Sequence, residues 1–364
     1  MYKTLIINPG STSTKLSIFE DDNEVWKNNL DHSSEEIKKF KKIIDQLDWR
    51  QELIEEAISN SKFELEDLDA IVARGGVALD PLLGGTYIID EDMVYDLKIS
   101  KNSAHASNLA GIIAYNFGKL IDKPAFTVDP ISLDEFEDVA RLSGLPEIPR
   151  KCQSHALNLK SIGRKTAENI DKKFDDCNLI GAHLGGGISI APLKKGRIVD
   201  VNNANQGGPY SPERVGTLPS LDLAEYIFEN NPDRDKFVKK LLGGGGLTAY
   251  LNTNDGREIE KMIEEGNNKA KLVYEGMIYQ IAKEIGAMAT VLNGDVDAIF
   301  ITGGLAHSTY ITDRVTKKVE YIAEVHVYPG AEEMKNLAEG ALRVLNGEEK
   351  YLTYQKGKVE IDIF

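Results

Sequence analysis

Two segments of the chain join an apolar run to a turn of glycine and small polar residues, a combination that suits phosphate binding. The first reads INPGSTST over 7–14, and the second reads HLGGGIS over 183–189. Glycine and small residues let backbone N–H groups turn inward and approach a phosphate closely. Either segment alone is typical of an ordinary tight hairpin. Because each begins a corresponding half of the chain, we interpret the pair as the phosphate-binding turns of a duplicated domain, with the phosphate held in a cleft between the halves.

The two turns, and a third apolar run that ends in glycine, supply the candidate ligands for a nucleotide. The first turn lacks the GxxxxGK[ST] pattern of a P-loop, so its hydroxyl groups and backbone amides are the expected phosphate donors. The third segment, ITGGLA over 301–306, offers flat backbone to a base or ribose, although a plain strand-to-helix turn has the same pattern. The candidate nucleotide ligands are Asn8, Gly10, Ser11, Thr12, Ser13, Lys15, Gly185, Gly186, Gly187, Gly303, Gly304 and Leu305.

Charged residues next to apolar runs are the candidates for the chemistry itself. Arg74 follows the run at 70–73, and its planar guanidinium can bind a carboxylate or a phosphate through two hydrogen bonds. Asp129 follows the run at 125–128 and could hold a metal ion or its waters, although Asp-Pro is also a common turn. His183 could donate to a phosphoryl oxygen or could be a buried structural histidine.

Apolar strand-like runs alternate with amphipathic helical patterns in both halves of the chain, which predicts an α/β fold. Helices are expected over 33–60, 104–120, 155–172, 264–292 and 331–345. The seam between the halves is expected near the Pro- and Gly-containing segment 144–150. Four successive glycines at 243–246 are interpreted as a mobile connector, because glycine holds regular structure poorly.

The composition narrows the class of protein. A chain of 364 residues is long enough for two domains, each with its own core. The net charge of −15 leaves no basic surplus for a nucleic acid, while a nucleotide needs only a few local donors. We expect no membrane span and no signal peptide. Cys152 and Cys177 are too few for a disulfide scaffold or a zinc site, and a cytoplasmic location is the default.

Taken together and in this order, the segments resemble the acetate and butyrate kinase family of the actin-like ATPase superfamily over essentially the whole chain. The family pattern N-A-G-S-S-S falls on 8–13, where Pro9 and the following Thr-Lys are similar to the butyrate kinase branch. The resemblance implies two duplicated actin-like ATPase (ribonuclease H-like) domains with a cleft between them. The carboxylate-side domain would comprise residues 1–149 and 335–364, and the nucleotide-binding domain would comprise 150–334.

The resemblance also implies roles for particular residues. Arg74 would hold the substrate carboxylate, and His183 would contact the phosphoryl group. Asp129 and Glu332 would be linked to Mg²⁺, with Asn8 on the metal or its waters. Glu332 belongs to an acidic pair at the start of the last expected helix, where acids also favour the helix dipole, so a purely structural role stays open.

Three departures from the family pattern concern the expected catalytic cations and the acyl pocket. The family segment F-H-G-T-S-H corresponds to residues 150–155 of this chain. Its last histidine is kept as His155, but its first histidine is replaced by Lys151. The family segment G-T-R, which carries the family's second catalytic arginine, corresponds to residues 216–218, and Leu218 stands in place of that arginine. Arg214 is a candidate substitute for it. His105 is a shifted match to the histidine of the substrate pocket.

The resemblance implies reversible, direct in-line transfer of a phosphoryl group from ATP to a short-chain fatty acid, most closely butyrate, to give an acyl phosphate and ADP. Branched-chain acids, propionate and acetate are alternative substrates, and a sugar kinase or an ATP-driven switch of the same superfamily is a more remote alternative. The expected partners are the fatty acid or acyl phosphate, ATP or ADP with Mg²⁺, and further copies of the chain, because small residues line the helix expected over 264–292.

Overall fold

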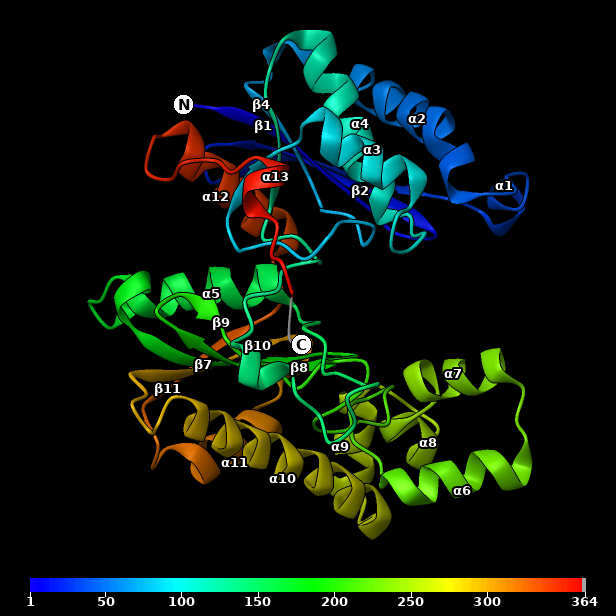
Figure 1. Ribbon diagram of the computed structural model, residues 1–364, viewed down its shortest axis with the longest axis vertical. Coiled ribbons are helices and arrows are strands. Elements are labelled where there is room, and N and C mark those ends of the chain that lie inside the picture. The colour runs from blue at the N-terminus through cyan, green and yellow to red at the C-terminus, as the bar shows by residue number, and fades with distance from the viewer. Residues whose placement is uncertain (362–364) are drawn as a thin grey trace. The chain divides into compact units, whose positions relative to one another are not determined.

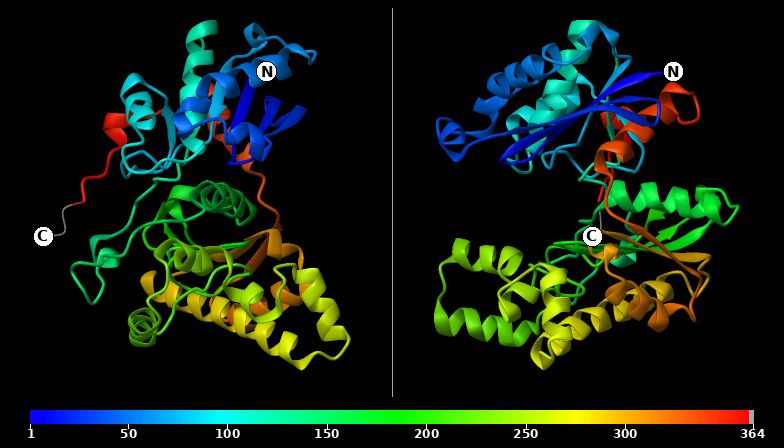
Figure 2. Two further views of the ribbon diagram at one scale, coloured as in Figure 1. Left: turned by 90° about the vertical axis from the view of Figure 1, so that its right-hand side faces the viewer. Right: turned by 180° about the vertical axis from the view of Figure 1, so that it is seen from behind.

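The computed structural model describes residues 1–361, which form two compact α/β units (Figures 1 and 2). Unit 1 comprises Met1–Glu135 together with the chain from Glu332 onward, and unit 2 comprises Phe136–Ala331. The boundaries predicted from the sequence fall after residues 149 and 334, whereas the compact units divide after residues 135 and 331. The α/β class is confirmed for both units.

Unit 1 is built on a mixed sheet with the strand order β3-β2-β1-β4-β6-β5. β1 is antiparallel to β2 and parallel to β4, which is in turn parallel to β6. The carboxyl ends of β1, β4 and β6 therefore lie along one edge of the sheet, where ligands of α/β folds gather. The strands are β1 (Lys3–Pro9), β2 (Ser13–Glu20), β3 (Asn23–Asp31), β4 (Ala70–Ala73), β5 (Thr86–Ile88) and β6 (Ala125–Val128).

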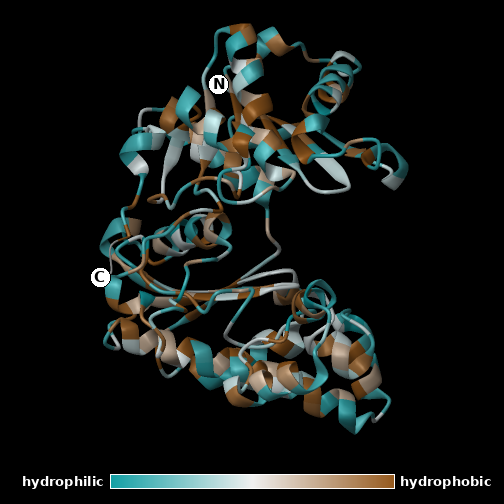
Figure 3. Cartoon of the chain, turned by 45° about the vertical axis from the view of Figure 1, so that its right-hand side comes forward, coloured by the Kyte–Doolittle hydropathy of each residue, from teal (hydrophilic) through white to brown (hydrophobic). Residues whose placement is uncertain are grey.

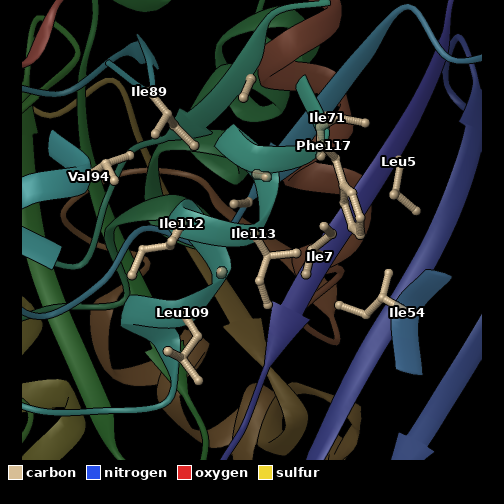
Figure 4. Packing of buried hydrophobic residues seen from close by; sticks show 14 of the residues in the cluster. Leu5, Ile7, Ile54, Ile71, Ile89, Val94, Leu109, Ile112, Ile113 and Phe117 are labelled. Atoms are coloured by element: carbon tan, nitrogen blue, oxygen red, sulfur yellow. The ribbon is translucent and has the colours of Figure 1, made fainter. Parts of the chain in front are cut away.

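Helices cover both faces of the unit 1 sheet. Alternation along β1 turns Leu5 and Ile7 toward α4, where they join the buried cluster that includes Ile113 (Figure 4). On the other face α12 packs so closely that a Cβ on Gly340 would meet the side chain of Val128. The helices of unit 1 are α1 (Ser34–Ile37), α2 (Leu47–Ser59), α3 (Glu91–Ile99), α4 (Ser107–Ile121), α12 (Glu333–Leu345) and α13 (Tyr354–Gly357), with 3₁₀ turns at Ile43–Gln46 and Leu65–Asp67.

Unit 2 repeats the strand order of unit 1. Its sheet runs β11-β10-β7-β8-β9, so that a hairpin with an outer third strand is again followed by two parallel strands on the opposite side. The matching order supports the predicted duplication of one domain. The strands are β7 (Asn178–Leu184), β8 (Ile188–Lys194), β9 (Arg197–Ile198), β10 (Ala298–Gly303) and β11 (Val325–Pro329).

Two long helices sandwich the unit 2 sheet. α10 packs Met277 and Ile281 against the face that carries Ile180, and α5 packs Leu159 against Gly181 on the opposite face. Figure 3 colours much of these strands brown, as expected for strands covered on both sides. The helices are α5 (Ala156–Asn169), α6 (Ser220–Asn230), α7 (Arg234–Gly243), α8 (Gly246–Leu251), α9 (Gly256–Glu264), α10 (Asn268–Val291) and α11 (Thr309–Val319), with 3₁₀ turns at Asp138–Arg141, Phe174–Asp176 and Gly304–His307.

The glycine run at 243–246 is not the connector that the sequence analysis expected. Gly243 ends α7 and Gly246 begins α8. The Gly245 N–H donates to the carbonyl of Glu213 at 2.9 Å, and Gly246, at a φ of +55°, lies against the backbone of Ser211. The run therefore packs against the loop that carries residues 211–214.

No helix in residues 1–361 has the length and apolar character needed to cross a membrane.

Candidate active site

The ligand edge of the unit 1 sheet brings Asn8, Arg74 and Glu333 together. Asn8 lies near the end of β1, and the Arg74 N–H donates to the carbonyl of Ile7 at 3.1 Å, which continues the pairing of β1 with β4. Glu333 is the first residue of α12. One of its carboxylate oxygens accepts from Arg74 Nη1, and the other accepts from Asn8 Nδ2 at 3.0 Å. A guanidinium and an amide thus converge on one carboxylate.

Of the two adjacent acids at the start of α12, Glu333 faces the site residues. Glu332 is exposed, and its backbone carbonyl accepts from the Asn336 N–H at 2.8 Å. Within residues 1–361 its carboxylate makes no hydrogen bond or ion pair with another side chain. The sequence contains the acidic pair but does not reveal which member faces the strands. Successive side chains on a helix point about 100° apart around its axis, so only one of the two can face them. The link of Glu332 to a metal stays a prediction.

Asp129 occupies an unusual backbone conformation at the end of β6. Its φ is +38°, although it precedes Pro130, and left-handed backbone at a residue other than glycine costs about 1–3 kcal/mol. Its Oδ1 accepts from the Gly85 N–H at 2.8 Å, and its own N–H donates to the carbonyl of Gly85 at 2.9 Å. Burial, followed by the charges of Asp129 and Glu135, raises the pKa of Tyr87. A carboxylate is thus held in place at the ligand edge at a cost in backbone strain.

The first turn presents two faces. Ser11 and Thr12 are exposed, while Thr14 is fully buried with its hydroxyl 2.8 Å from His32 Nε2. Thr14 therefore belongs to the inner side of the turn and is not available to a phosphate. The buried guanidinium of Arg50, on α2, holds this inner side by hydrogen bonds to the carbonyls of the turn.

Arg50 is not among the residues predicted from the sequence, although the chain carries a signal for it. Arg50 lies on the apolar face of its helix, four residues before Ile54 and eight before Ile58. A charged residue on such a face needs partners inside the protein. Burial, and then the charges of Arg50 and Arg74, lower the pKa of His105, so both cations act on the same part of unit 1.

The second turn is flanked by two stacked histidines. The rings of His155 and His183 lie 4.0 Å apart at an interplanar angle of 11°. His183 Nδ1 lies 2.6 Å from Asn158 Oδ1, and His155 Nδ1 lies 2.8 Å from the hydroxyl of Ser189. An amide oxygen only accepts, so the proton of this bond belongs to Nδ1 of His183. Its Nε2 is then directed to the glycine turn, since a Cβ on Gly185 would lie 3.5 Å from it.

Arg214 contacts the second turn directly. A Cβ on Gly187 would collide with its guanidinium, so the glycine allows the close approach. Arg214 Nη1 donates to the carbonyl of Ala204 at 2.8 Å, and burial lowers the pKa of the side chain. The hydroxyl of Ser211 donates to the carbonyl of Gly186 at 2.5 Å and fixes the loop to the turn. Of the two candidate cations, Arg214 is therefore the one placed against the glycines.

Lys151 is more exposed than Arg214. Its side chain is exposed, and its backbone carbonyl accepts from Asn203 Nδ2 at 3.1 Å. The N–H of Ala204 donates to the carbonyl of Gln153 at 3.2 Å. The loop at 203–204 therefore connects the segment of Lys151 to the arginine.

The third glycine segment combines a tight packing point with an open one. Gly303 has a φ of +93°, and a Cβ there would lie 2.8 Å from the carbonyl carbon of Leu184. Its N–H and carbonyl pair with Gly330 at 2.9 and 3.0 Å. At Gly304, no atom of the described chain beyond Gly304 and its two chain neighbours lies within 4 Å of a Cβ position. The segment thus keeps β10 against β7 while leaving backbone accessible beside Leu305, as a base or ribose site requires.

The repeated strand order, with a turn of small residues after the first strand of each unit, defines two duplicated actin-like ATPase domains. The fold is similar to that of acetate kinase from Porphyromonas gingivalis, with a TM-score of 0.78 at 19% identity over 95% of this chain and 100% of that one. It is also similar to a propionate kinase from Francisella tularensis, with a TM-score of 0.70 at 18% identity over 93% and 99% of the two chains.

Sequence comparison identifies the family. Residues 148–328 match the model of the Acetokinase family. The chain is 49% identical over 349 residues to the probable butyrate kinase 2 of Caldanaerobacter subterraneus subsp. tengcongensis, which covers 96% of this chain and 98% of that relative. The protein belongs to the Acetokinase family, which confirms the resemblance inferred from its motifs.

Proposed function

We propose that the protein reversibly transfers the γ-phosphoryl group of ATP to the carboxylate of a short-chain fatty acid, with butyrate as the preferred acid. Its family makes it a kinase that uses ATP and ADP and a carboxyl group as acceptor. The observation that carries the proposal is the convergence of Arg74 and Asn8 on the Glu333 carboxylate. The same donors can hold the carboxylate of a substrate. The choice of butyrate is supported by the name of the 49% identical relative.

The reaction needs no general base. A fatty acid is already ionised near neutral pH, like the side chains of Asp and Glu. One carboxylate oxygen attacks the γ-phosphorus, the bond from that phosphorus to the β,γ-bridging oxygen breaks, and ADP leaves with the electron pair. Catalysis then rests on positioning and on neutralising charge. In this scheme Arg74 orients the acid.

The second turn supplies donors for the phosphoryl oxygens. The glycines at 185–187 leave backbone close to the ligand, and His183 directs Nε2 to the turn because its Nδ1 is fixed by Asn158. Arg214 places a cation against Gly187 and would take the role of the family's arginine, whose position is occupied here by Leu218. His155 supports the ring of His183 by stacking. Removing one such hydrogen-bond donor typically lowers kcat about 10²–10³-fold.

The donors on the ligand edge of unit 1 fit a magnesium ion shared with phosphate. Mg²⁺ is usually held by one or two carboxylates together with substrate phosphates and water. The described residues contain no cluster of three or more His, Cys, Asp or Glu able to hold a metal without such help. We propose that Asp129, Asn8 and the acidic pair Glu332–Glu333 hold Mg²⁺ or its waters. When bound, the ion would neutralise charge on the phosphates.

The test is Mg²⁺-dependent formation of acyl phosphate from ATP, trapped as the hydroxamate, with acetate, propionate, butyrate, isobutyrate and valerate. We expect product from several acids with the highest kcat/KM for butyrate. One methylene is worth about 1–3 kcal/mol in an apolar pocket, so neighbouring acids should also react. A preference for isobutyrate would point to a branched-chain kinase. No product from any acid, despite nucleotide binding, would exclude a carboxylate kinase and favour the sugar-kinase or switch alternatives.

We further propose that the enzyme acts in the cytoplasm as a homo-oligomer. The small-residue stripe on α10 does not by itself supply the interface, because Gly276 lies against Tyr210 inside unit 2 and Ala289 is buried. Leu272 and Tyr279 support an interface instead, since they are 75% and 55% exposed two helical turns apart. Light scattering coupled to gel filtration tests the assembly, and Leu272→Glu should weaken it.

A further inference from the structure

Arg50 is a buried charge whose partners in the described structure are all neutral. Its side chain is 1% exposed. Its guanidinium donates to the carbonyls of Gly10 and Ser11 at 3.0 and 3.2 Å, and to Thr14 Oγ1 and Gln46 Oε1 at 3.1 Å each. Burial lowers its pKa to about 10, which leaves it protonated at neutral pH. No carboxylate of residues 1–361 forms an ion pair with it.

A buried cation without a counterion is costly, so a fold that keeps one gains something from it. Four hydrogen bonds to neutral oxygens satisfy most donors of the guanidinium, but they do not neutralise its positive charge. That uncompensated charge lies directly behind a turn whose other side is exposed. An anion bound on the exposed side would complete the charge balance.

The turn is oriented so that it faces such an anion with N–H groups. All peptide bonds here are trans, so each carbonyl points opposite to the N–H of the next residue. Because the carbonyls of Gly10 and Ser11 point to Arg50, the N–H groups of Ser11 and Thr12 point away from it. Neither N–H donates to any acceptor in the described chain. Successive amides that point the same way form an anion-binding concavity.

We propose that Arg50 is a positioning residue that orients the Ser11 and Thr12 amides to bind the phosphoryl group being transferred. The inference rests on the proposed kinase function. Arg50 does not touch the ligand. It fixes two peptide dipoles with their positive ends outward and adds its own charge behind them. The ligand class is a terminal phosphoryl group, either the γ-phosphate of ATP or the phosphate of an acyl phosphate.

A purely structural role, in which Arg50 only ties α2 to the hairpin, makes a different prediction. Loosening the hairpin would weaken ADP and ATP alike. The proposed role weakens only ligands that carry the transferable phosphoryl group, which ADP lacks. Comparing the two nucleotides therefore separates the two roles.

The experiment is calorimetric titration of Arg50→Met with MgADP and with the imido analogue of MgATP. Because a hydrogen bond to a charged group is stronger than a neutral one, we expect the affinity for the ATP analogue to fall about 10-fold or more, with ADP affinity within about twofold of wild type. The matched control is Ile54→Val, a buried apolar change one turn later on α2, which should leave the ratio of the two affinities unchanged.

Equal losses for both nucleotides, or no loss for the analogue, would overturn the proposal. If Arg50→Met does not fold, Arg50→Lys decides: it keeps a charge but cannot hold two carbonyls, so its ATP-analogue affinity should fall selectively, and wild-type affinity would contradict the role. Added guanidinium ion, and not urea, should partly restore Arg50→Ala. These measurements use nucleotide binding alone, so they remain decisive even if no fatty acid is phosphorylated.

Discussion

Glu333 binds the guanidinium of Arg74 across 259 positions of sequence, and its second oxygen binds Asn8. The contact shows that the ligand edge of unit 1 accepts a carboxylate. It also means that a substrate carboxylate arriving at Arg74 must share the guanidinium with Glu333 or displace it. The acid at position 333 is therefore expected to set both how the substrate binds and how the site is charged.

Glu333→Gln should lower kcat at least about 10-fold, because it removes a carboxylate that joins two residues of the site. Glu332→Gln is the comparison, since Glu332 is adjacent in sequence but exposed, and we expect a smaller loss of kcat there than at Glu333. Steady-state kinetics with butyrate and MgATP checks both. A larger effect at 332 than at 333 would reverse the assignment and return the metal-linked role to Glu332.

Arg74→Ala should reduce kcat/KM for the fatty acid about 10²–10³-fold, since it removes the charged donor that we propose orients the acid. Binding of MgADP, measured by calorimetry, should stay within about twofold. Arg74→Lys keeps the charge without the planar fork and should recover only part of the activity. Full activity in Arg74→Ala would remove this residue from the scheme.

Asn158→Asp should change the pH dependence of the kinase. Asn158 Oδ1 lies 2.6 Å from His183 Nδ1, and a carboxylate there would favour the protonated imidazole and raise the pKa of His183. The limb of the kcat profile that reports His183 should move to higher pH by about 1–2 units. Asn169→Asp, at the exposed end of the same helix, is the control and should not move it. Identical profiles for the two variants would argue against the contact.

Mild acid should destabilise unit 1 through His32. Burial, followed by the charge of Arg50, lowers the pKa of His32 from 6.5 to about 4. Between these values the unfolded state binds a proton that the folded state does not, so stability rises with pH through this window and is lost as the pH falls from about 6.5 toward 4. Urea unfolding midpoints at several pH values measure this. His32→Gln should flatten the dependence in that window, and an unchanged slope would contradict the lowered pKa.

The sequence was sufficient for the duplicated fold because hairpins and apolar runs are local signals. The turn at 10–14, the glycines at 185–187 and Gly303 all fall at the ends of strands, as expected. The stretch 33–60 was expected to be one helical segment, but the structure breaks it into α1, a 3₁₀ turn and α2. The capping box of Ser33 starts α1 early, and Lys39–Lys42 interrupts the helix before α2 begins.

The contacts that bring the candidate site together were less accessible to sequence reasoning. The Glu333–Arg74 and Arg50–Gly10 bonds join residues far apart in sequence, and no periodicity reports such pairs. Arg214 could be suggested from the missing arginine at 218, but only packing shows its guanidinium over Gly187. The partner of His183 was equally hidden, because Asn158 looks like any polar residue on an amphipathic helix.

Unit 1 is assembled from both ends of the chain, whereas unit 2 is one uninterrupted segment. During synthesis on the ribosome, unit 2 has all of its sequence before unit 1 does. The face of β6 that carries Val128 is not covered until Gly340 has been synthesised. Arg74 likewise cannot bind Glu333 until residue 333 has been synthesised. A nascent chain truncated before residue 332 therefore lacks the helix that covers one face of its first sheet. Translation must pass residue 333 before Arg74 and Glu333 can meet, so a chain terminated before that point is exposed to aggregation before it can be active.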